Sequence, residues 1–413
     1  MTTGLMKRLL ILSLALMPLM LPGILFAQSA TSIPDEYPSL FKGTRPAGMG
    51  NAFIAMPGSD ENAPFYNPAS INDFERKLYF RLLSFAGDFS PGLIGLGKDV
   101  FDLASDIDKE STDSGKINVF RAFVDKHTGE FESVGLRLPI LQVQHKWFSA
   151  SILTDSRTTI SFRNRAFTNF EISSRSDMGG TLGGAYGFFD DRLQAGVNVK
   201  VLHRLSIDET ITTDDIVNAA DFNAVVPRRR ATGVGFDLGL KGTLPTFNQK
   251  WLEILKPTAG FTWQDIGNTR FGNNVPDTPQ SVGAGFAIHP TWRSWEFHVA
   301  NDFRELNQGV DFIKKWNVGA EAVAPKLWFF RPSVRIGANQ GYLAAGTTLD
   351  FKAVKFEFAT YGEEAGAVSR QKELRRLAFN LSFGFTTNGR DQPLPPIEEP
   401  THETSPSEET PAL

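Results

Sequence analysis

Apolar and polar residues alternate with a period of two along most of the chain, from about residue 78 to residue 386. The alternating segments are about ten residues long, and Gly, Pro, Asn or Asp separates them. Because successive side chains of a strand point to opposite faces, each segment predicts a strand with one apolar face and one small or polar face. The clearest apolar faces are Val134, Leu136, Leu138 and Ile140; Ala195, Val197, Val199 and Val201; Val234, Phe236, Leu238 and Leu240; Val282, Ala284, Phe286 and Ile288; Trp295, Phe297 and Val299; Val354, Phe356 and Phe358; and Leu377, Phe379, Leu381, Phe383 and Phe385.

Strand length separates two fold classes. A soluble β-sandwich also has alternating strands, but these average about five or six residues. Strands of about ten residues are long enough to cross a bilayer at a tilt. Lys200, Asp237 and Glu357 each lie on the polar face of a segment, which suits a water-filled lumen. About 310 residues, at about 22 for each strand with its connection, predict an all-β transmembrane antiparallel barrel of about 14 strands.

A few segments break this pattern. Residues 93–107 place apolar side chains at helical spacing, and 119–124 predict a second, short helix. The polar stretch 208–230 predicts a long extracellular loop. The tryptophans lie at or near predicted strand ends, as in the aromatic girdles at membrane surfaces, although a place in a core remains an alternative. They are Trp147, Trp251, Trp263, Trp292, Trp295, Trp316 and Trp328.

The N-terminal segment has the features of a secretory signal peptide. Lys7 and Arg8 precede an apolar run over 9–26, and small residues follow from Ala27. This pattern predicts a cleaved signal peptide at 1–27 and export to the bacterial outer membrane. An uncleaved anchor helix is the alternative, but prolines and a glycine interrupt the run. The chain has no cysteine, so neither a lipid-modified cysteine nor a disulfide is expected.

Composition and charge narrow the possible functions. The sequence has 35 Phe and 37 Gly but only 41% hydrophobic residues, which favours a membrane barrel over a large soluble enzyme. Lys and Arg number 42 against 46 Asp and Glu, and we expect no nucleic-acid partner. Residues 388–413 are acidic and rich in proline, a composition that predicts a disordered tail.

Motifs for enzymatic chemistry are missing from the sequence. The six histidines show no paired spacing for a metal, and no nucleophile motif of the Gly-x-Ser-x-Gly type occurs. Glycines alternate over 233–239, but no helical pattern follows them, so we interpret this segment as a strand instead of a phosphate-binding loop. We therefore expect no enzyme activity, no cofactor and no metal.

The region before the first predicted strand contains a glycine-rich segment and an Asn-Pro-Ala sequence. The glycine-rich segment includes Arg45, Gly48, Met49, Gly50 and Asn51, and the Asn-Pro-Ala box is Asn67, Pro68 and Ala69. Glycine allows close backbone approach or a positive φ, and Asn before Pro favours a turn. Such a segment is a poor strand, so we expect 28–75 to fold into the lumen as a hatch, or plug, of a barrel formed by 76–387.

The sequence Arg-Pro-Ala-Gly-Met-Gly-Asn-Ala-Phe-Ile-Ala at 45–55, followed by Phe-Tyr-Asn-Pro-Ala at 65–69, resembles the N-terminus of the long-chain fatty-acid transporter (FadL) superfamily. The closer resemblance is to its TraF-like or PorV-like relatives, and Gln-Asp-Ile-Gly at 264–267 and the segments 335–342 and 359–364 also resemble them. The resemblance spans roughly 43–386. It implies a 14-stranded barrel, a hatch, and the sideways exit of hydrophobic substrates through a strand kink. Only the Asn-Pro-Ala box matches the family residue by residue. The resemblance implies that it holds the hatch against the barrel wall, and the alternative is that it forms a plain structural turn.

The chain also departs from this family pattern. Residues continue beyond Phe385, the expected terminal aromatic of the barrel, and the usual fatty-acid-binding residues cannot be matched. Two functions therefore stay open. The first is a channel for passive uptake of small hydrophobic compounds. The second is a partner protein in secretion or surface assembly that transports nothing. The expected partners are outer-membrane lipids, with either a hydrophobic small molecule or a secretion-system protein.

Overall fold

The computed structural model describes residues 42–56, 60–74, 77–164, 169–212, 227–365 and 372–386. The expected signal peptide, the first part of the expected hatch (28–41) and the acidic tail (388–413) lie outside the described residues. Cleavage after residue 27 and disorder of the tail therefore stay predictions.

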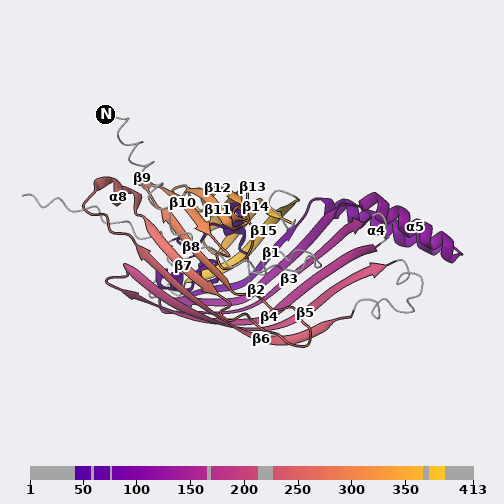
Figure 1. Cartoon of the computed structure of the whole chain (residues 1–413). Coiled ribbons are helices and arrows are strands. Elements are labelled where there is room, and N and C mark those ends of the chain that lie inside the picture. The colour runs from indigo at the N-terminus through magenta and orange to yellow at the C-terminus, as the bar shows by residue number, and fades with distance from the viewer. Residues whose placement is uncertain are drawn as a thin grey trace, which may run out of the picture.

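Fourteen antiparallel strands form a closed barrel (Figure 1). Each strand pairs with its neighbours in the chain, β10 pairs with both β8 and β11, and the β1–β15 pair closes the ring. The two-residue β9 (Thr291–Trp292) only extends the edge of β10. The predicted fold class and number of strands are confirmed. The strands are β1 (Tyr79–Phe89), β2 (Phe131–His145), β3 (Phe148–Asn164), β4 (Asn169–Phe188), β5 (Leu193–Thr212), β6 (Arg229–Thr243), β7 (Thr258–Gln264), β8 (Ser281–Ile288), β10 (Trp295–Phe303), β11 (Trp316–Val323), β12 (Arg331–Asn339), β13 (Tyr342–Phe351), β14 (Val354–Glu364) and β15 (Glu373–Thr386).

The two faces of the wall follow the predicted alternation. In β6, Val234, Phe236, Leu238 and Leu240 are 43–51% exposed, whereas the side chain of Asp237, which lies between them, is buried. This is the arrangement of a barrel whose exterior contacts lipid and whose interior is polar.

The strands differ in length more than the sequence pattern predicts. β3, β4 and β5 have 17, 20 and 20 residues, whereas β7, β8 and β11 have 7, 8 and 8. The long strands extend one side of the barrel toward the helices α4 and α5 (Figure 1). Part of the expected loop 208–230 belongs to these extensions, because 208–212 is in β5 and 229–230 is in β6. Residues 213–226 lie outside the described part of the chain.

The two ends of the barrel differ. At the turn end, short connections such as the one between His145 and Phe148 join the strands. At the loop end, α4 (Gly92–Lys109) and α5 (Asp113–His127) join β1 to β2 as a helical hairpin, so both predicted helices are present. The second is longer than expected, because the Thr112 hydroxyl caps its first turn by accepting the Gly115 N–H. Among the described residues, no helix is both long and apolar enough to cross a membrane.

The tryptophans lie close to the barrel ends. Those at the turn end lie in or beside connections, and Trp328 is 93% exposed. At the loop end, the indole N–H groups of Trp263 and Trp316 donate to Gln280 and Asn301. Two rings of this kind suit the two surfaces of a membrane. The turn-end tryptophans are Trp147, Trp251, Trp292, Trp295 and Trp328.

Candidate functional site: the hatch in the lumen

Residues 42–56 and 60–74 lie inside the barrel, and we call these two stretches together the hatch. It contains three short helices, α2 (Thr44–Gly48), α3 (Ala63–Tyr66) and η1 (Pro68–Asp73). Almost all of its described side chains are buried. Its central apolar side chains, including Phe53, Phe65 and Tyr66, cluster with Leu153, Ala287 and Ala300 of the wall. The hatch thus fills the lumen at this level.

The Asn-Pro-Ala box connects two parts of the hatch with the wall. Asn67 Oδ1 accepts the N–H of Ala69 at 3.0 Å, which caps η1. Its Nδ2 donates to the carbonyl oxygens of Ile54 in the hatch and Leu240 in β6, both at 3.0 Å. Pro68 occupies the first turn of η1, where its missing N–H costs nothing. The side chain of Asn67 therefore stabilises a turn and also contacts the wall.

A row of inward-facing glycines on the wall supports the hatch backbone, and we call it the glycine track. A side chain at these positions would collide with the hatch. An ideal Cβ on Gly239 would lie 2.0 Å from Asn67 Oδ1, and one on Gly319 would lie 2.2 Å from the Met49 carbonyl oxygen. Glycine in a strand commonly marks such close backbone approach. The track consists of the paired positions Gly196 and Gly239, Gly260 and Gly285, and Gly319 and Gly337, together with Gly346.

The glycine-rich segment of the hatch lies on this track. Gly50 has a φ of +61°, and an ideal Cβ there would lie 2.4 Å from the Ala338 carbonyl oxygen. An ideal Cβ on Gly48 would lie 3.1 Å from the Cα of Gly346. Asn51 follows, also with positive φ, and its side chain donates to Asn339 and accepts from the Tyr66 hydroxyl. The glycines of the hatch therefore face those of the wall, and neither side leaves room for a Cβ.

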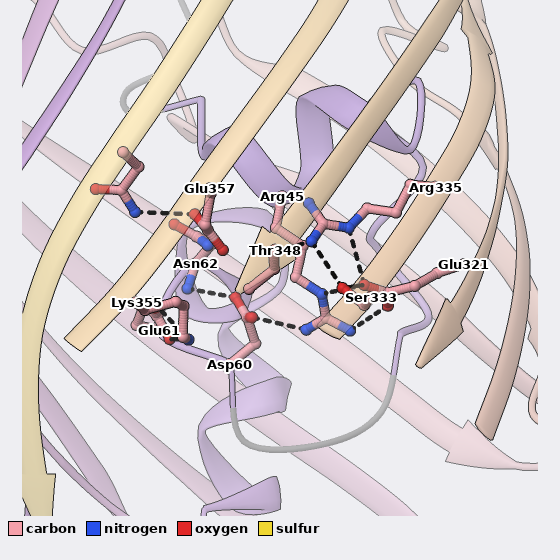
Figure 2. A network of polar contacts seen from close by, with 11 residues as sticks. Arg45, Asp60, Glu61, Asn62, Glu321, Ser333, Arg335, Thr348, Lys355 and Glu357 are labelled. Carbon is pink, nitrogen blue, oxygen red and sulfur yellow. Dashed lines mark hydrogen bonds and ion pairs between the residues drawn. The ribbon is translucent and has the colours of Figure 1, made fainter. Parts of the chain in front are cut away.

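Buried ion pairs connect the hatch to the strands (Figure 2). Arg45 of α2 binds Asp60 of the hatch at 2.7 Å and Glu321 of β11 at 2.5 Å, and Glu321 also accepts from Arg335 of β12 at 2.9 Å. Burial lowers the pKa of Arg45, but the carboxylates of Glu321 and Asp60 raise it further, to well above its ordinary value. The guanidinium therefore stays charged in the lumen, where it needs these partners.

A second ion pair lies beside the first. Glu61 of the hatch accepts from Lys355 of β14 at 2.9 and 3.0 Å. Burial raises the pKa of Glu61, but the positive charges of Lys355 and Arg81 lower it further, to about 2. Glu61 is therefore ionised at neutral pH, and the two ion pairs hold Arg45 and Glu61 of the hatch against one sector of the wall.

Both described ends of the hatch are also held by charged groups. At its start, Lys42 binds Glu363 at 2.5 Å, and Arg137 donates to the Lys42 carbonyl oxygen. At its end, Asp73 pairs with Lys241 and accepts from Gln194 at 2.9 Å. These contacts fix the hatch at several separate points along the barrel.

Asp302 of β10 binds the middle of the hatch through backbone groups. Its Oδ2 accepts the N–H groups of Phe53 and Ile54 at 2.5 and 2.8 Å. Its Oδ1 is buried without a hydrogen-bond partner among the described residues. The carboxylate thereby satisfies two hatch donors that face away from water.

The wall is interrupted between β1 and β2. Leu82 pairs with Leu141 and Ala86 pairs with Arg137, while 83–85 lie outside the β1–β2 ladder. Leu83 has a positive φ of 28° at a bulge that also shifts the register against β15. The β2–β3 register shifts at the same level, beside Pro139, which has no N–H to donate. The local loss of strand pairing makes this the weakest described point of the β1–β2 seam.

The connection from β7 to β8 folds inward at the loop end, and we call residues 265–280 the inward loop. Arg204 of β5 donates to Pro276 O at 2.7 Å and to Thr278 at 2.9 Å, and its guanidinium lies 4.0 Å from the centroid of the Phe271 ring. Lys200 binds Asp265 of this loop at 2.7 Å and Asp237 of β6 at 2.8 Å. The inward loop therefore covers the inner face of β5 and β6.

A cavity, which we call the vestibule, lies between the inward loop and the facing strands at the loop end. Strands β3, β4 and β5 line one side, and the adjacent ends of β14 and β15 line the other. Its lining is mostly polar and includes Arg157, Arg175, Ser206, Asp277, Glu364 and Arg376. This lining differs from the apolar cluster around the hatch.

The residues that hold the hatch were only partly recognisable in the sequence. Gly48, Gly50 and the Asn-Pro-Ala box stand out by residue type. The wall partners Glu321, Asp302 and Lys355 do not, because they are ordinary members of alternating strands. The alternating pattern places each of these charged residues on the inward face of its strand. It does not show which residue of the hatch each one contacts.

Comparison with known proteins identifies the fold. No protein-family model matches the chain, and no curated protein sequence matches it. A solved structure described as a mutant of the TodX monoaromatic hydrocarbon channel has a TM-score of 0.51 at 10% identity, and the match covers 84% of this chain and 98% of that one. The Pseudomonas putida toluene transporter TodX has a TM-score of 0.47 at 13% identity, with coverage of 82% and 97%. A Pseudomonas aeruginosa FadL homologue has a TM-score of 0.36 at 9% identity, and the match covers 83% of this chain and 98% of that one.

The first of these similarities shows a shared barrel fold, and the other two are too weak to add to it. The barrel fold that the resemblance implied is thus supported, and membership of the superfamily stays a prediction. The TraF-like or PorV-like branch stays a prediction.

Proposed function

We propose that this protein is an outer-membrane channel for the passive uptake of small hydrophobic compounds, with the hatch as its gate. The observation that carries the proposal is a lipid-facing barrel with its lumen filled by a separate segment that polar contacts hold on a glycine track. A wall of this kind needs no internal segment for its own closure, because its strands already pair around the ring. The hatch therefore controls the passage of compounds through the barrel.

The interrupted seam supplies the proposed exit. Leu153 belongs to the apolar cluster of the hatch and pairs with Pro139, which lies beside the break in β2. On the outside, Leu82, Leu83 and Phe85 of β1 are 42–46% exposed. Apolar groups thus line both sides of the wall at one level. A hydrophobic compound that loosened the hatch would pass sideways into the bilayer without crossing the polar rest of the lumen.

The loop 208–230 and the acidic tail are the features that favour the alternative, a partner in secretion or surface assembly. Most of that loop and all of the tail lie outside the described residues, so this function stays a prediction. Recovery of a specific secretion component with the tagged protein would favour it, and its absence would count against it.

The proposed channel is tested with the purified full-length protein in liposomes. We expect protein-dependent entry of toluene and decanoic acid, and no comparable entry of glucose, because the polar solute has no reason to enter the bilayer through the seam. Deletion of 43–75 should raise the entry of all three solutes, since it empties the lumen. Absence of toluene and decanoic acid entry with the intact protein, together with no gain after the deletion, would refute the proposal.

A further inference from the structure

The connection between β6 and β7 contains a short helix at the turn end of the barrel, α8 (Lys250–Leu255) (Figure 1). Turn-end connections of membrane barrels are usually short. Those between β2 and β3 and between β13 and β14 have only two residues each, whereas the β6–β7 connection covers 244–257. A connection of this length and structure is more than a link between two strands.

Backbone hydrogen bonds fix this connection to the wall. The Leu244 N–H donates to the Pro257 carbonyl oxygen at 2.9 Å, which extends the β6–β7 ladder. The His289 N–H, next to the end of β8, donates to the Leu255 carbonyl oxygen at 2.7 Å. The helix is therefore held at a fixed position beside the turn ends of three strands.

Three kinds of side chain lie on three sides of α8: half-buried leucines, exposed charged groups and exposed apolar groups. Residues three apart share a side of a helix, so each kind forms a pair. The pairs are Leu252 and Leu255, Lys250 and Glu253, and Trp251 and Ile254. The members of the apolar pair are 40% and 60% exposed. A helix between protein and water needs only the first two sides, so the third indicates contact with an apolar environment.

The place of α8 along the wall is the turn-end edge of the lipid-facing band. The outward residues of β6 and its continuation are apolar from Val234 to Leu244, ten residues further, and the outward residue before this run is Thr232. At about 3.3 Å per residue and a tilt of about 40°, the run covers about 25 Å, which is the height of the apolar band of a membrane barrel. The chain then continues through Phe247, which is 76% exposed, into α8. The helix therefore lies where the band ends and the headgroup region begins.

Basic groups lie close to the polar side of α8. Lys250 belongs to this side, and Lys256 follows the helix, with its Nζ 3.5 Å from Thr291 Oγ1 in the β8–β10 connection. Arg293 belongs to the same β8–β10 connection. Glu253 is the one acidic residue of α8, so the positive groups outnumber it. Basic groups beside an exposed apolar surface complement the phosphate groups of anionic lipids.

We propose that α8 is an interfacial anchor that binds anionic phospholipids of the turn-end leaflet. Phe247, Trp251 and Ile254 insert among the acyl chains, and Lys250 and Lys256 contact the phosphate groups. A helix that lies in a membrane interface has this division into an apolar side and a basic polar side, and tryptophan is enriched at this depth. The proposal goes beyond the channel, because it concerns how the barrel is held in the membrane and not what passes through it.

The first test uses the absence of cysteine from the chain, because a single introduced cysteine can carry a bimane fluorophore. Ile254→Cys, Glu253→Cys and, on the wall, Leu240→Cys are labelled in the full-length protein in phosphatidylcholine nanodiscs. We expect phosphatidylcholine brominated near its headgroup to quench the label at position 254 at least as strongly as the one at 240. Iodide in the water should quench only the label at 253. Equal iodide quenching at 253 and 254 would overturn the proposal, and so would protection of position 254 from both quenchers, which would indicate a covering protein.

The second test measures the preference for anionic lipid with the same label at position 254. Brominated phosphatidylglycerol or brominated phosphatidylcholine is added as an equal minor fraction of the nanodisc lipid. We expect phosphatidylglycerol to be favoured by about fivefold or more, the factor that one basic residue near a charged lipid surface provides. High salt should reduce this preference. Equal quenching by the two lipids would overturn the assignment of an anionic headgroup.

The matched variants carry the same label. Lys250→Gln combined with Lys256→Gln should abolish the preference for phosphatidylglycerol but keep the quenching by phosphatidylcholine, because the apolar side is unchanged. Lys352→Gln, in the β13–β14 turn on the far side of the ring, is the control and should keep the preference. A preference retained by the double variant, or lost equally in the control, would overturn the role of the two lysines.

Discussion

Arg45 of the hatch and Glu321 of β11 form a two-point ion pair, with Nη2–Oε2 and Nε–Oε1 distances of 2.5 and 3.1 Å. Glu321 also binds Arg335, so one carboxylate serves two guanidinium groups, one partly buried and one fully buried. Removal of a single partner from a buried pair is costly, because it leaves the other charge uncompensated. The stability of the hatch should therefore depend strongly on Glu321.

We expect Glu321→Gln to destabilise the hatch by about 3–5 kcal/mol, because Arg45 and Arg335 lose their shared carboxylate. Limited proteolysis should then cleave the hatch at a protease concentration that leaves the wild-type hatch intact, while the strands stay protected. Glu253→Gln, on the exposed surface of α8 (Lys250–Leu255), is the control and should change nothing. An unchanged cleavage pattern in Glu321→Gln would show that this pair does not hold the hatch.

Two substitutions at Asn67 separate its turn from its wall contact. Asn67→Asp keeps an oxygen that can accept the Ala69 N–H but loses the donor to Ile54 O and Leu240 O. If the wall contact matters, Asn67→Asp should lower stability nearly as much as Asn67→Ala, by about 1–3 kcal/mol. The thermal unfolding midpoints of the two variants provide the comparison. A wild-type midpoint for Asn67→Asp would instead favour the plain structural turn.

Glu305 lies in the connection between β10 and β11, outside the strands. Its burial predicts that the stability of the protein depends on pH. Burial raises its pKa to about 7, although Arg304 and Lys42 partly oppose this. Because the folded state holds the proton more tightly than the unfolded state, the ionised carboxylate costs stability. Stability should therefore fall as the pH rises from about 4.5 through about 7, by an upper limit of about 3 kcal/mol.

Glu305→Gln should remove this part of the pH dependence. The unfolding midpoints of the wild-type protein and the variant, measured at pH 4.5 and pH 7.5, provide the test. We expect the wild-type midpoint to drop more between the two values than that of Glu305→Gln. Parallel changes in both proteins would contradict the prediction.

Joint deletion of Leu83 and Ile140 tests the seam between β1 and β2. Leu83 is the extra residue of β1 against β15, and Ile140 is the extra residue of β2 against β3, whereas the β1–β2 register is the same on both sides of 83–85. Without both residues, β1 can pair with β2 and β15 in a regular ladder. We expect toluene entry into liposomes to fall severalfold, while the barrel keeps its thermal stability. Leu83→Ala is the matched control, because it keeps the extra residue and should keep most of the entry. If the deletion left toluene entry at the wild-type rate, the compound would have to take another route.

Comparison of sequence and structure shows which features a pattern of residues can predict. The period of two specified the lipid-facing side chains of β6 and β15, because a strand must point alternate residues to opposite sides. The pattern did not reveal that Arg45 meets Glu321, which lies 276 residues further along the chain. Such a contact depends on the register and tilt of the whole ring, and those are set by pairings that no single segment specifies.

The inward loop shows a second limit. Gly, Asn and Pro in 265–280 indicated a connection, but turn-forming residues say nothing about the direction in which a connection folds. A clue was nevertheless present in β6. An ideal Cβ on Gly235 would lie 2.3 Å from the hydroxyl oxygen of Thr269. The alternating glycines of 233–239 were correctly interpreted as a strand, and they also leave space for the two segments that this strand contacts.

The glycine track has a consequence for biogenesis. The hatch immediately precedes β1 in the chain, and its backbone occupies space that only strands without side chains at that level can enclose. A ring sealed beforehand would have to admit the hatch from the turn end, where β1 begins, and fit it against wall positions that leave no room for a Cβ. We therefore expect strand insertion to proceed around a hatch that is already inside, so that β1 and β15 meet last and complete the enclosure.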